Sequence, residues 1–176
     1  MSDAVKRIQE LLKLPQELCK MCGKCCHIAT FKGGLSYEEI IELINDPESD
    51  PVQVEGAKDF LAIFEPYDSH ETIKSKEPQF YESVMKKVGK PGMSFFHCRY
   101  IGKHGGCLIH EDRPLLCRMY PVPNERTLFF NGCGFEKQCM ENWKEITKIV
   151  EEVKAKQAAL AKQRSELEKQ QQNQQQ

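Results

Sequence analysis

Four cysteines lie within eight residues near the beginning of the chain, in the order Cys19-Lys-Met-Cys22-Gly-Lys-Cys25-Cys26. A chain that turns across two intervening residues brings successive thiolates close enough to share one metal ion or one iron–sulfur cluster. Five more cysteines follow later in the chain. Cys139 opens the last expected helix and is expected only to pack. The sequence therefore predicts a metal-binding protein, with ligands drawn from Cys19, Cys22, Cys25, Cys26, Cys98, Cys107, Cys117 and Cys133.

The spacing leaves the kind of metal open. Three cysteines separated by two residues each match the first part of the C-x2-C-x2-C-x3-C-P run of bacterial ferredoxins, which favours an iron–sulfur cluster of the 4Fe-4S type. Cys26 instead stands next to Cys25, so we expect it to reach a second site or to be a reactive thiol. Zinc is the alternative, because two pairs of cysteines can supply its four tetrahedral ligands. Thiolates suit both metals, and the sequence does not decide between one site and two.

Two arginines stand close to the later cysteines, at Arg113 and Arg118. A guanidinium stays charged and can donate hydrogen bonds to a thiolate-rich, negatively charged cluster, which offsets its like-charge repulsion. We therefore predict that both contribute to cofactor binding. The alternative is that they form surface ion pairs with Glu111, Asp112 or Glu125.

Composition limits the other possibilities. The chain has 176 residues and a net charge of −1, which suggests one domain and gives no general attraction to nucleic acid. Its apolar runs are short and interrupted by charge, so we expect no membrane span. Charged residues also interrupt the first twenty positions, which argues against a signal peptide. We therefore expect a cytoplasmic protein whose thiols stay reduced.

The hydrophobic pattern predicts a small, cysteine-rich α+β domain with helices and short strands, followed by a long C-terminal helix. Helices are expected over 3–14, 37–44, 55–64, 78–88 and 112–120, short strands near 93–96, 100–101, 107–109 and 128–130, and a loop over 65–76. The predicted division is a zinc- or iron-chelating domain over 1–140, a helix over 141–169 and a disordered Gln-rich tail over 170–176.

Two motifs together resemble a known family. Cys19-x-x-Cys22-Gly-x-Cys25-Cys26 is followed by Cys107-Leu-Ile-x-x-x-Arg113-Pro-Leu-Leu-Cys117-Arg118-x-Tyr-Pro121. In this order the motifs resemble the CxxCxxCC family of zinc- or iron-chelating domains, from Cys19 to about Cys139. His110 departs from the pattern, because a tyrosine is common there. The chain is also similar to the cysteine-rich part of flagellin lysine N-methylases, which implies a connection to iron–sulfur clusters and methyl transfer.

Three functions follow from these observations. The first is a metal-binding protein that carries an iron–sulfur cluster or zinc and has a redox or sensing role. The second, implied by the methylase resemblance alone, is an iron–sulfur-dependent protein-modifying enzyme. The third is a zinc-stabilised interaction module whose C-terminal helix binds a protein partner. Signatures of phosphate-binding loops, serine hydrolases and zinc proteases are absent from the sequence.

Overall fold

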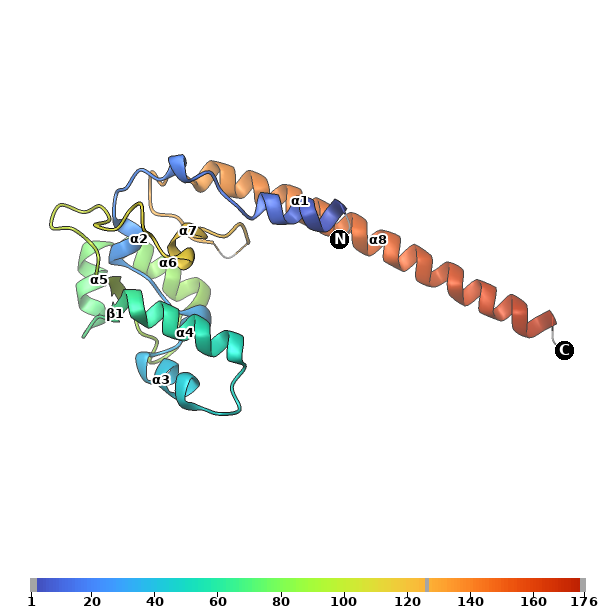
Figure 1. The fold of residues 1–176 in the computed structure, drawn as a ribbon, viewed down its shortest axis with the longest axis horizontal. Coiled ribbons are helices and arrows are strands. Elements are labelled where there is room, and N and C mark those ends of the chain that lie inside the picture. The colour runs from blue at the N-terminus through green and yellow to red at the C-terminus, as the bar shows by residue number, and fades with distance from the viewer. Residues whose placement is uncertain (1–2, 126, 175–176) are drawn as a thin grey trace.

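The computed structural model describes residues 3–125 and 127–174. A two-stranded antiparallel sheet lies among helices, and a long C-terminal helix extends away from them (Figure 1). In chain order the elements are α1 (Asp3–Leu11), η1 (Gln16–Leu18), α2 (Lys24–His27), η2 (Lys32–Gly34), α3 (Tyr37–Asn45), α4 (Pro51–Ile63), β1 (Phe64–Pro66), α5 (His70–Lys76), α6 (Pro78–Val88), β2 (Phe96–Cys98), α7 (Leu115–Arg118) and α8 (Glu136–Gln174). The predicted α+β class is confirmed.

Local capping explains where several helices begin. At the start of α3, the Ser36 hydroxyl accepts a 3.1 Å hydrogen bond from the Glu39 amide, and the Glu39 carboxylate accepts one of 2.7 Å from the Ser36 amide. This reciprocal capping box satisfies two amide groups that the helix itself leaves unpaired. The α4 helix begins earlier than expected, at Pro51, because the Asp50 carboxylate caps the amide of Val52 at 2.9 Å.

The core joins the first cysteine segment to the sheet. Strand β1 pairs with β2 so that Phe64 lies opposite Cys98. Phe96 also exchanges two backbone hydrogen bonds of 2.9 Å with Ala29, three residues after Cys26. The Phe60 ring stacks on Phe64 at 4.8 Å between centroids, which encloses this junction in aromatic side chains. A cysteine-bearing strand and the segment after the first cysteine motif are therefore held together.

Several expectations about local structure are wrong. Residues 65–76, expected as loop, contain most of β1 and the helix α5, which Ser69 caps through the amide of Glu71 at 3.1 Å. The strand expected near 93–96 is displaced, since β2 (Phe96–Cys98) shares only Phe96 with it; within the described residues the other expected strands do not form, and Ile101 and Cys107 make a single bridge that is too short for a ladder. The short helix expected over 112–120 is a single turn, α7, whose N-cap position is held by Pro114 rather than by Asp112.

The helix α8 begins at Glu136, before the expected residue 141, and continues through Gln174. Residues 170–174 of the expected disordered tail thus continue the helix, and the rest of that tail, 175–176, lies outside the described residues. The domain boundaries stay a prediction. In the described part of the chain, no helix combines the length and apolar character needed to cross a membrane.

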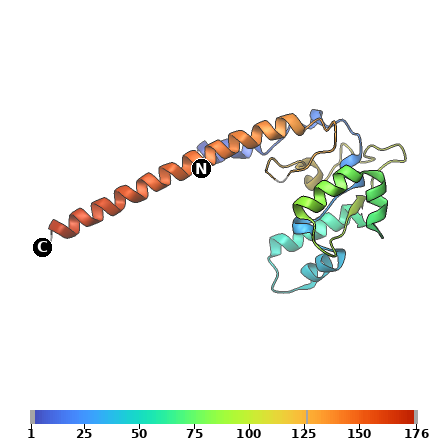
Figure 2. The ribbon, with the colours of Figure 1, turned by 180° about the vertical axis from the view of Figure 1, so that it is seen from behind.

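The helix α1 lies alongside the first half of α8 (Figures 1 and 2). The buried Asn142 amide donates a 2.7 Å hydrogen bond to the carbonyl of Leu11, and Arg7 forms a 2.8 Å ion pair with Glu145. Beyond this contact, residues 154–166 of α8 are exposed, including Leu160. A protein partner for that exposed half stays a prediction.

Candidate metal centre

Three segments that are distant in sequence meet around the first cysteine motif. The turn at Gly105 and Gly106 lies against it, since a Cβ atom on Gly23 would be 3.0 Å from the backbone nitrogen of Gly106. On the other side, Gly134 lies in backbone contact with Leu18. The Lys20 ammonium fixes that side by donating a 2.9 Å hydrogen bond to the carbonyl of Gly132. The motif is therefore enclosed between the segment that contains Cys107 and the turn that contains Cys133.

The backbone around Cys22 explains how the motif turns. Met21 and Gly23, on either side of it, both have left-handed backbone conformations, with φ of 49° and 73°. Gly23 is the N-cap residue of the single-turn helix α2. The Gly23 carbonyl accepts a 2.8 Å hydrogen bond from the amide of Cys26. This geometry leaves Cys22 exposed and places Cys25 and Cys26 on α2.

Five thiols influence one another's ionisation through their charges, and we call them the core-side thiols: Cys25, Cys26, Cys98, Cys107 and Cys117. The side chains of Cys26 and Cys117 pack against the aromatic cluster that contains the buried Cys98. Burial, followed by the charges of Cys98, Cys107 and Cys25, raises the pKa of Cys117 to about 11. A negative charge on one of these thiols disfavours ionisation of the others, so the five share one electrostatic environment.

The adjacent cysteines Cys25 and Cys26 differ in character. A hydrogen bond from the Cys26 thiol lowers the pKa of Cys25 to about 7, whereas the same hydrogen bond and burial raise the pKa of Cys26. Their side chains pack on different core clusters, Cys26 beside Cys98 and Cys25 beside Ile28 and Phe95. At neutral pH the first thiol to ionise in this group is therefore Cys25.

Backbone amide groups favour the ionised form of two cysteines. The Tyr100 amide donates a 3.4 Å hydrogen bond to Sγ of Cys98. Burial raises the pKa of Cys133, and amide hydrogen bonds from Phe135 and Glu136, at the beginning of α8, oppose that rise. Hydrogen bonds to a thiolate stabilise its charge, which is the form that binds a metal.

The two arginines have different surroundings. Arg113 donates hydrogen bonds to the His110 carbonyl at 3.0 Å and to Oε1 of Gln16 at 3.1 Å, and its charge contributes to lowering the pKa of Cys25. Arg118 donates through Nε to the carbonyl of Arg113 at 2.6 Å. Arg113 therefore acts on the thiols electrostatically, while Arg118 stabilises the loop. Their binding of a cofactor stays a prediction.

Two of the three ion pairs expected as the alternative for these arginines do not form, and a pair with Glu125 stays a prediction. Among the described residues, neither guanidinium pairs with the carboxylate of Glu111 or Asp112, and Arg118 reaches Glu111 through its backbone carbonyl, at 3.5 Å. Sequence reasoning missed Gln16, whose Nε2 also donates to the carbonyl of Arg118 at 2.9 Å. A lone glutamine before the motif gives no sequence signal, because its partners lie about a hundred residues later.

The donor chemistry fits a soft metal, but the donors are not yet gathered around one point. Cysteine thiolates are ligands of zinc and of iron–sulfur clusters. Over residues 3–125 and 127–174, no group of three or more His, Cys, Asp or Glu side chains is arranged so that it could hold a metal ion. The predicted ligand set thus remains a prediction, and binding would require the thiols to draw closer together.

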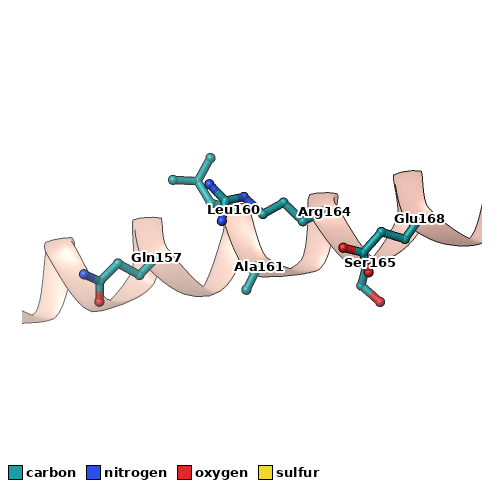
Figure 3. Close-up of a pocket in the computed structure, with 6 residues that line it drawn as sticks. All are labelled: Gln157, Leu160, Ala161, Arg164, Ser165 and Glu168. Atoms are coloured by element: carbon teal, nitrogen blue, oxygen red, sulfur yellow. The ribbon is translucent and has the colours of Figure 1, made fainter.

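Two surface hollows formed by the described residues offer no alternative centre. One, of about 220 Å³, is lined by residues that include His27, Tyr67 and Lys76. The other lies along α8, between Gln157 and Glu168, and all the residues that line it come from that one helix (Figure 3). Neither is lined by a cysteine.

A comparison with protein-family models finds one family. Residues 18–145 match CxxCxxCC, described as "Putative zinc- or iron-chelating domain". The matched region contains all nine cysteines, both arginines and the first turns of α8. No curated protein and no solved structure matches the chain.

Proposed function

The chain belongs to the CxxCxxCC family of zinc- or iron-chelating domains, and we propose that it chelates iron as an iron–sulfur cluster of the 4Fe-4S type. Its role in this proposal is redox transfer or sensing. Membership supports metal chelation by clustered cysteines. The choice of a cluster over a zinc ion goes beyond membership and rests on the spacing of the first cysteines.

The observation that carries the proposal is the packing of Cys26, Cys98 and Cys117 in one aromatic core cluster, which brings the first cysteine motif to two of the later cysteine segments. Four thiolates complete either a 4Fe-4S cluster or a zinc ion. The spacing of Cys19, Cys22 and Cys25 matches the ferredoxin-type run, which favours the cluster. The positive charge of Arg113 near Cys25 supports metal chelation of either kind, because zinc and an oxidised 4Fe-4S cluster held by four thiolates both carry excess negative charge.

The ligands in this proposal are the residues predicted from the sequence. Cys19, Cys22 and Cys25 supply the first motif, while Cys98, Cys107, Cys117 and Cys133 supply ligands from the later segments; Cys26 is either a further ligand or a redox-active thiol. All nine cysteines have free thiols in the structure. Free thiols of this number persist in a reducing compartment, which supports a cytoplasmic location.

The test is to purify the protein without oxygen and to measure bound iron, zinc and acid-labile sulfide beside a visible absorption spectrum. Iron with matching sulfide and a brown colour would support the proposal. Stoichiometric zinc without colour would overturn the cluster and leave a zinc-stabilised interaction module. A protein that contains neither iron nor zinc would overturn chelation in this chain.

A matched pair of variants locates the ligands. Cys22→Ser removes an exposed thiol and should lower the bound iron, whereas Met21→Ala changes an exposed neighbour that has no ligating role. Equal loss of iron in both variants would indicate a disturbed loop, and would count against Cys22 as a ligand.

A further inference from the structure

Two stretches of the chain contain basic residues but no acidic ones: residues 18–37, which include the first cysteine motif, and residues 83–110, which include Cys98 and Cys107. Together they hold seven lysines and one arginine, in a chain whose net charge is −1. Acidic residues are dense elsewhere, for example over 38–59, which hold eight of them and one lysine. Charge is therefore unevenly distributed, with cations around two of the cysteine-bearing segments.

The two acid-free stretches pack against each other. A Cβ atom on Gly105 would be 3.5 Å from the carbonyl oxygen of Cys22, and one on Gly23 would be 3.3 Å from Cδ1 of Ile101. Both distances are those of direct packing, with no room for another layer of side chains between the segments. The loop over 101–106 is therefore held directly against the turn that carries Cys22.

Three large apolar side chains are exposed where these segments meet: Met21, Tyr100 and Leu108 are 54%, 37% and 71% exposed. The Leu108 amide donates a 2.9 Å hydrogen bond to the carbonyl of Tyr100, so these two lie on neighbouring parts of one loop. A Cβ atom on Gly106 would be 3.8 Å from the carbonyl oxygen of Met21, which places the backbone of Met21 against the same loop. We call these three residues, together with the exposed Lys20 and Lys103, the cysteine-loop face.

The conformation of Met21 has no explanation in the packing of the fold. Its φ of 49° lies in the left-handed region, which glycine or asparagine tolerates better than a residue with a long side chain. Its side chain is exposed, so it gains little from packing in return. Residues held in such conformations cluster at binding and active sites, and a flexible methionine suits contact with a partner.

We propose that the cysteine-loop face binds an acidic surface of a separate protein. Met21, Tyr100 and Leu108 form the apolar centre of the contact, while Lys20 and Lys103 lie at its edge. An apolar centre with a polar edge is the usual arrangement of protein interfaces, and charges of opposite sign direct the encounter. The partner then lies against the turn that carries Cys22. This inference goes beyond the proposed function, because it does not depend on which metal the cysteines hold.

The positive charge of the two stretches is only partly neutralised by the chain itself. Three of the eight cations pair with carboxylates from other segments, at 3.4, 2.8 and 3.7 Å: Lys24 with Glu77, Lys90 with Glu39 and Arg99 with Glu65. Lys20 instead donates to the carbonyl of Gly132, a neutral acceptor that does not cancel its charge, and Lys103 is exposed. A carboxylate of a partner can therefore approach either ammonium group.

The apolar and the basic residues of this face each have a simpler explanation. Single exposed apolar residues are common on protein surfaces and need no partner. Cations near thiolates can serve only to offset their negative charge. Neither explanation accounts for apolar and basic side chains that gather beside the same turn. Lys20 also donates its hydrogen bond to a carbonyl oxygen rather than to a sulfur atom.

An acidic protein fits the face better than the other candidate occupants. Anionic membranes are bound by clusters of about four to eight cations, and a specific nucleic-acid site takes about six to ten phosphate contacts, so two lysines are too few for either. A second copy of this chain offers acidic residues over 38–59. That contact would join two different surfaces of one chain, and such contacts form rings or open chains rather than closed pairs.

The test selects peptides on the full chain, purified without oxygen so that any bound metal is retained. The probe is a display library of random short peptides. Peptides that combine Asp or Glu with apolar residues are expected to be enriched. A synthetic copy of an enriched peptide is then titrated against wild type and variants by fluorescence polarisation. Leu108→Ser and Lys103→Glu should each weaken its binding about tenfold, and added salt should weaken binding to wild type.

Matched controls make the same kinds of change at exposed positions of α4. Val52→Ser and Lys58→Glu should leave the affinity for the peptide unchanged. Metal analysis and circular dichroism check that each variant retains its metal content and its helices. Met21→Ser carries the test if Leu108→Ser does not fold.

Each outcome decides a separate point. A wild type that enriches no peptide, or only peptides without acidic residues, would overturn the inference, as would equal affinity in the face variants and the α4 controls. Binding to phosphatidylserine vesicles or single-stranded DNA in place of peptides would assign the lysines to another polyanion. Self-association that Lys103→Glu abolishes in sedimentation would assign the face to a second copy, and would overturn the separate partner. A wild type that selects acidic peptides but contains neither iron nor zinc would overturn the proposed function alone.

Discussion

Gly23 and Gly106 lie so close together that a Cβ atom on Gly23 would be 3.0 Å from the backbone nitrogen of Gly106. This contact joins the turn between Cys22 and Cys25 to the turn before Cys107. Glycine is needed at position 23 for such an approach, because a Cβ atom there would press on the backbone of Gly106, whereas the Cβ position of Gly106 itself has only an ordinary contact of 3.8 Å with the carbonyl of Met21. The packing of one cysteine loop on the other therefore depends on a residue that has no ligand atom of its own.

Gly23→Ala should consequently lower both stability and metal content. The alanine must adopt a left-handed conformation, at a cost of about 1–2 kcal/mol, and the overlap with Gly106 adds about 1–3 kcal/mol. Gly33→Ala is the matched control, since Gly33 has a similar φ of 74° but nothing within 4 Å of its Cβ position. Urea unfolding and metal analysis of both variants check this. If both lose the same stability and neither loses metal, the contact has no role in the site.

Removal of the metal should destabilise the whole cysteine-bearing region. A ligand that binds only the folded chain adds about 4 kcal/mol when its free concentration is a thousand times its dissociation constant. For a chain of this size that corresponds to a fall in the melting temperature on the order of 10 °C. Thermal unfolding before and after chelation under reducing conditions measures the change, and re-addition of metal is the control. An unchanged melting temperature would contradict ligation in the folded state.

Much of the helical structure could be predicted from the sequence, because its signals are local. The capping box of Ser36 and Glu39 marks α3, and Gly89 marks the end of α6. The helix α5 was missed, since it has only one buried apolar residue, Ile73, to reveal a periodic pattern. Such a short helix is defined by its cap at Ser69 and by its packing on α6.

The candidate ligands could be proposed from cysteine spacing, but their grouping could not. What brings Cys19 near Cys133 is the contact of Leu18 with Gly134 and the hydrogen bond from Lys20 to Gly132, whose partners are 112 residues apart. Neither contact leaves a pattern in the local sequence. The same applies to Gln16, which reaches Arg113 across 97 residues.

Arg113→Gln should make Cys25 less reactive at neutral pH. The Cys26 thiol is the main cause of the low pKa of Cys25, and the Arg113 charge is the smallest of the causes, so its loss should raise that pKa only modestly. The rate of Cys25 alkylation in the metal-free protein at pH 7 should fall by less than about tenfold, which is the effect of one pKa unit. Peptide mass spectrometry after timed alkylation measures this rate.

Arg99→Gln is the control for that measurement. Its guanidinium is half exposed and pairs with Glu65 at 3.7 Å rather than with a thiol. An equal fall in the alkylation rate in both variants would attribute the effect to the general charge of the surface, and would remove Arg113 from the site's electrostatics.

Asn142→Ala should weaken the contact between α1 and α8. The variant leaves the carbonyl of Leu11 without the 2.7 Å hydrogen bond that the buried amide donates, at a cost of about 1–3 kcal/mol. Denaturant unfolding followed by circular dichroism measures the loss. Glu145→Gln breaks the exposed ion pair with Arg7 on the same pair of helices and should cost less, because surface pairs are screened by solvent. A larger loss for Glu145→Gln would contradict the dominance of the buried hydrogen bond.

The Glu39–Lys90 pair should contribute stability that depends on pH. Lys90 donates a 2.8 Å hydrogen bond to Glu39, which, followed by the hydrogen bond from the Ser36 amide, lowers the pKa of Glu39 below its ordinary value of 4.5. Because the folded state holds this carboxylate charged, the contribution is complete above the unfolded pKa and is lost as pH falls through the folded one. Glu39→Gln keeps a residue that can complete the capping box, so it removes mainly the charge interaction.

The variant should therefore unfold at lower urea concentration than wild type at pH 7, and the two midpoints should converge as the pH falls below about 4.5. Glu38→Gln is the control, because it removes a carboxylate from the same first turn of α3. If Glu38→Gln shows the same difference from wild type and the same convergence, the effect belongs to the beginning of the helix in general. A difference confined to Glu39→Gln assigns it to Lys90, which packs the chain after α6 against the beginning of α3.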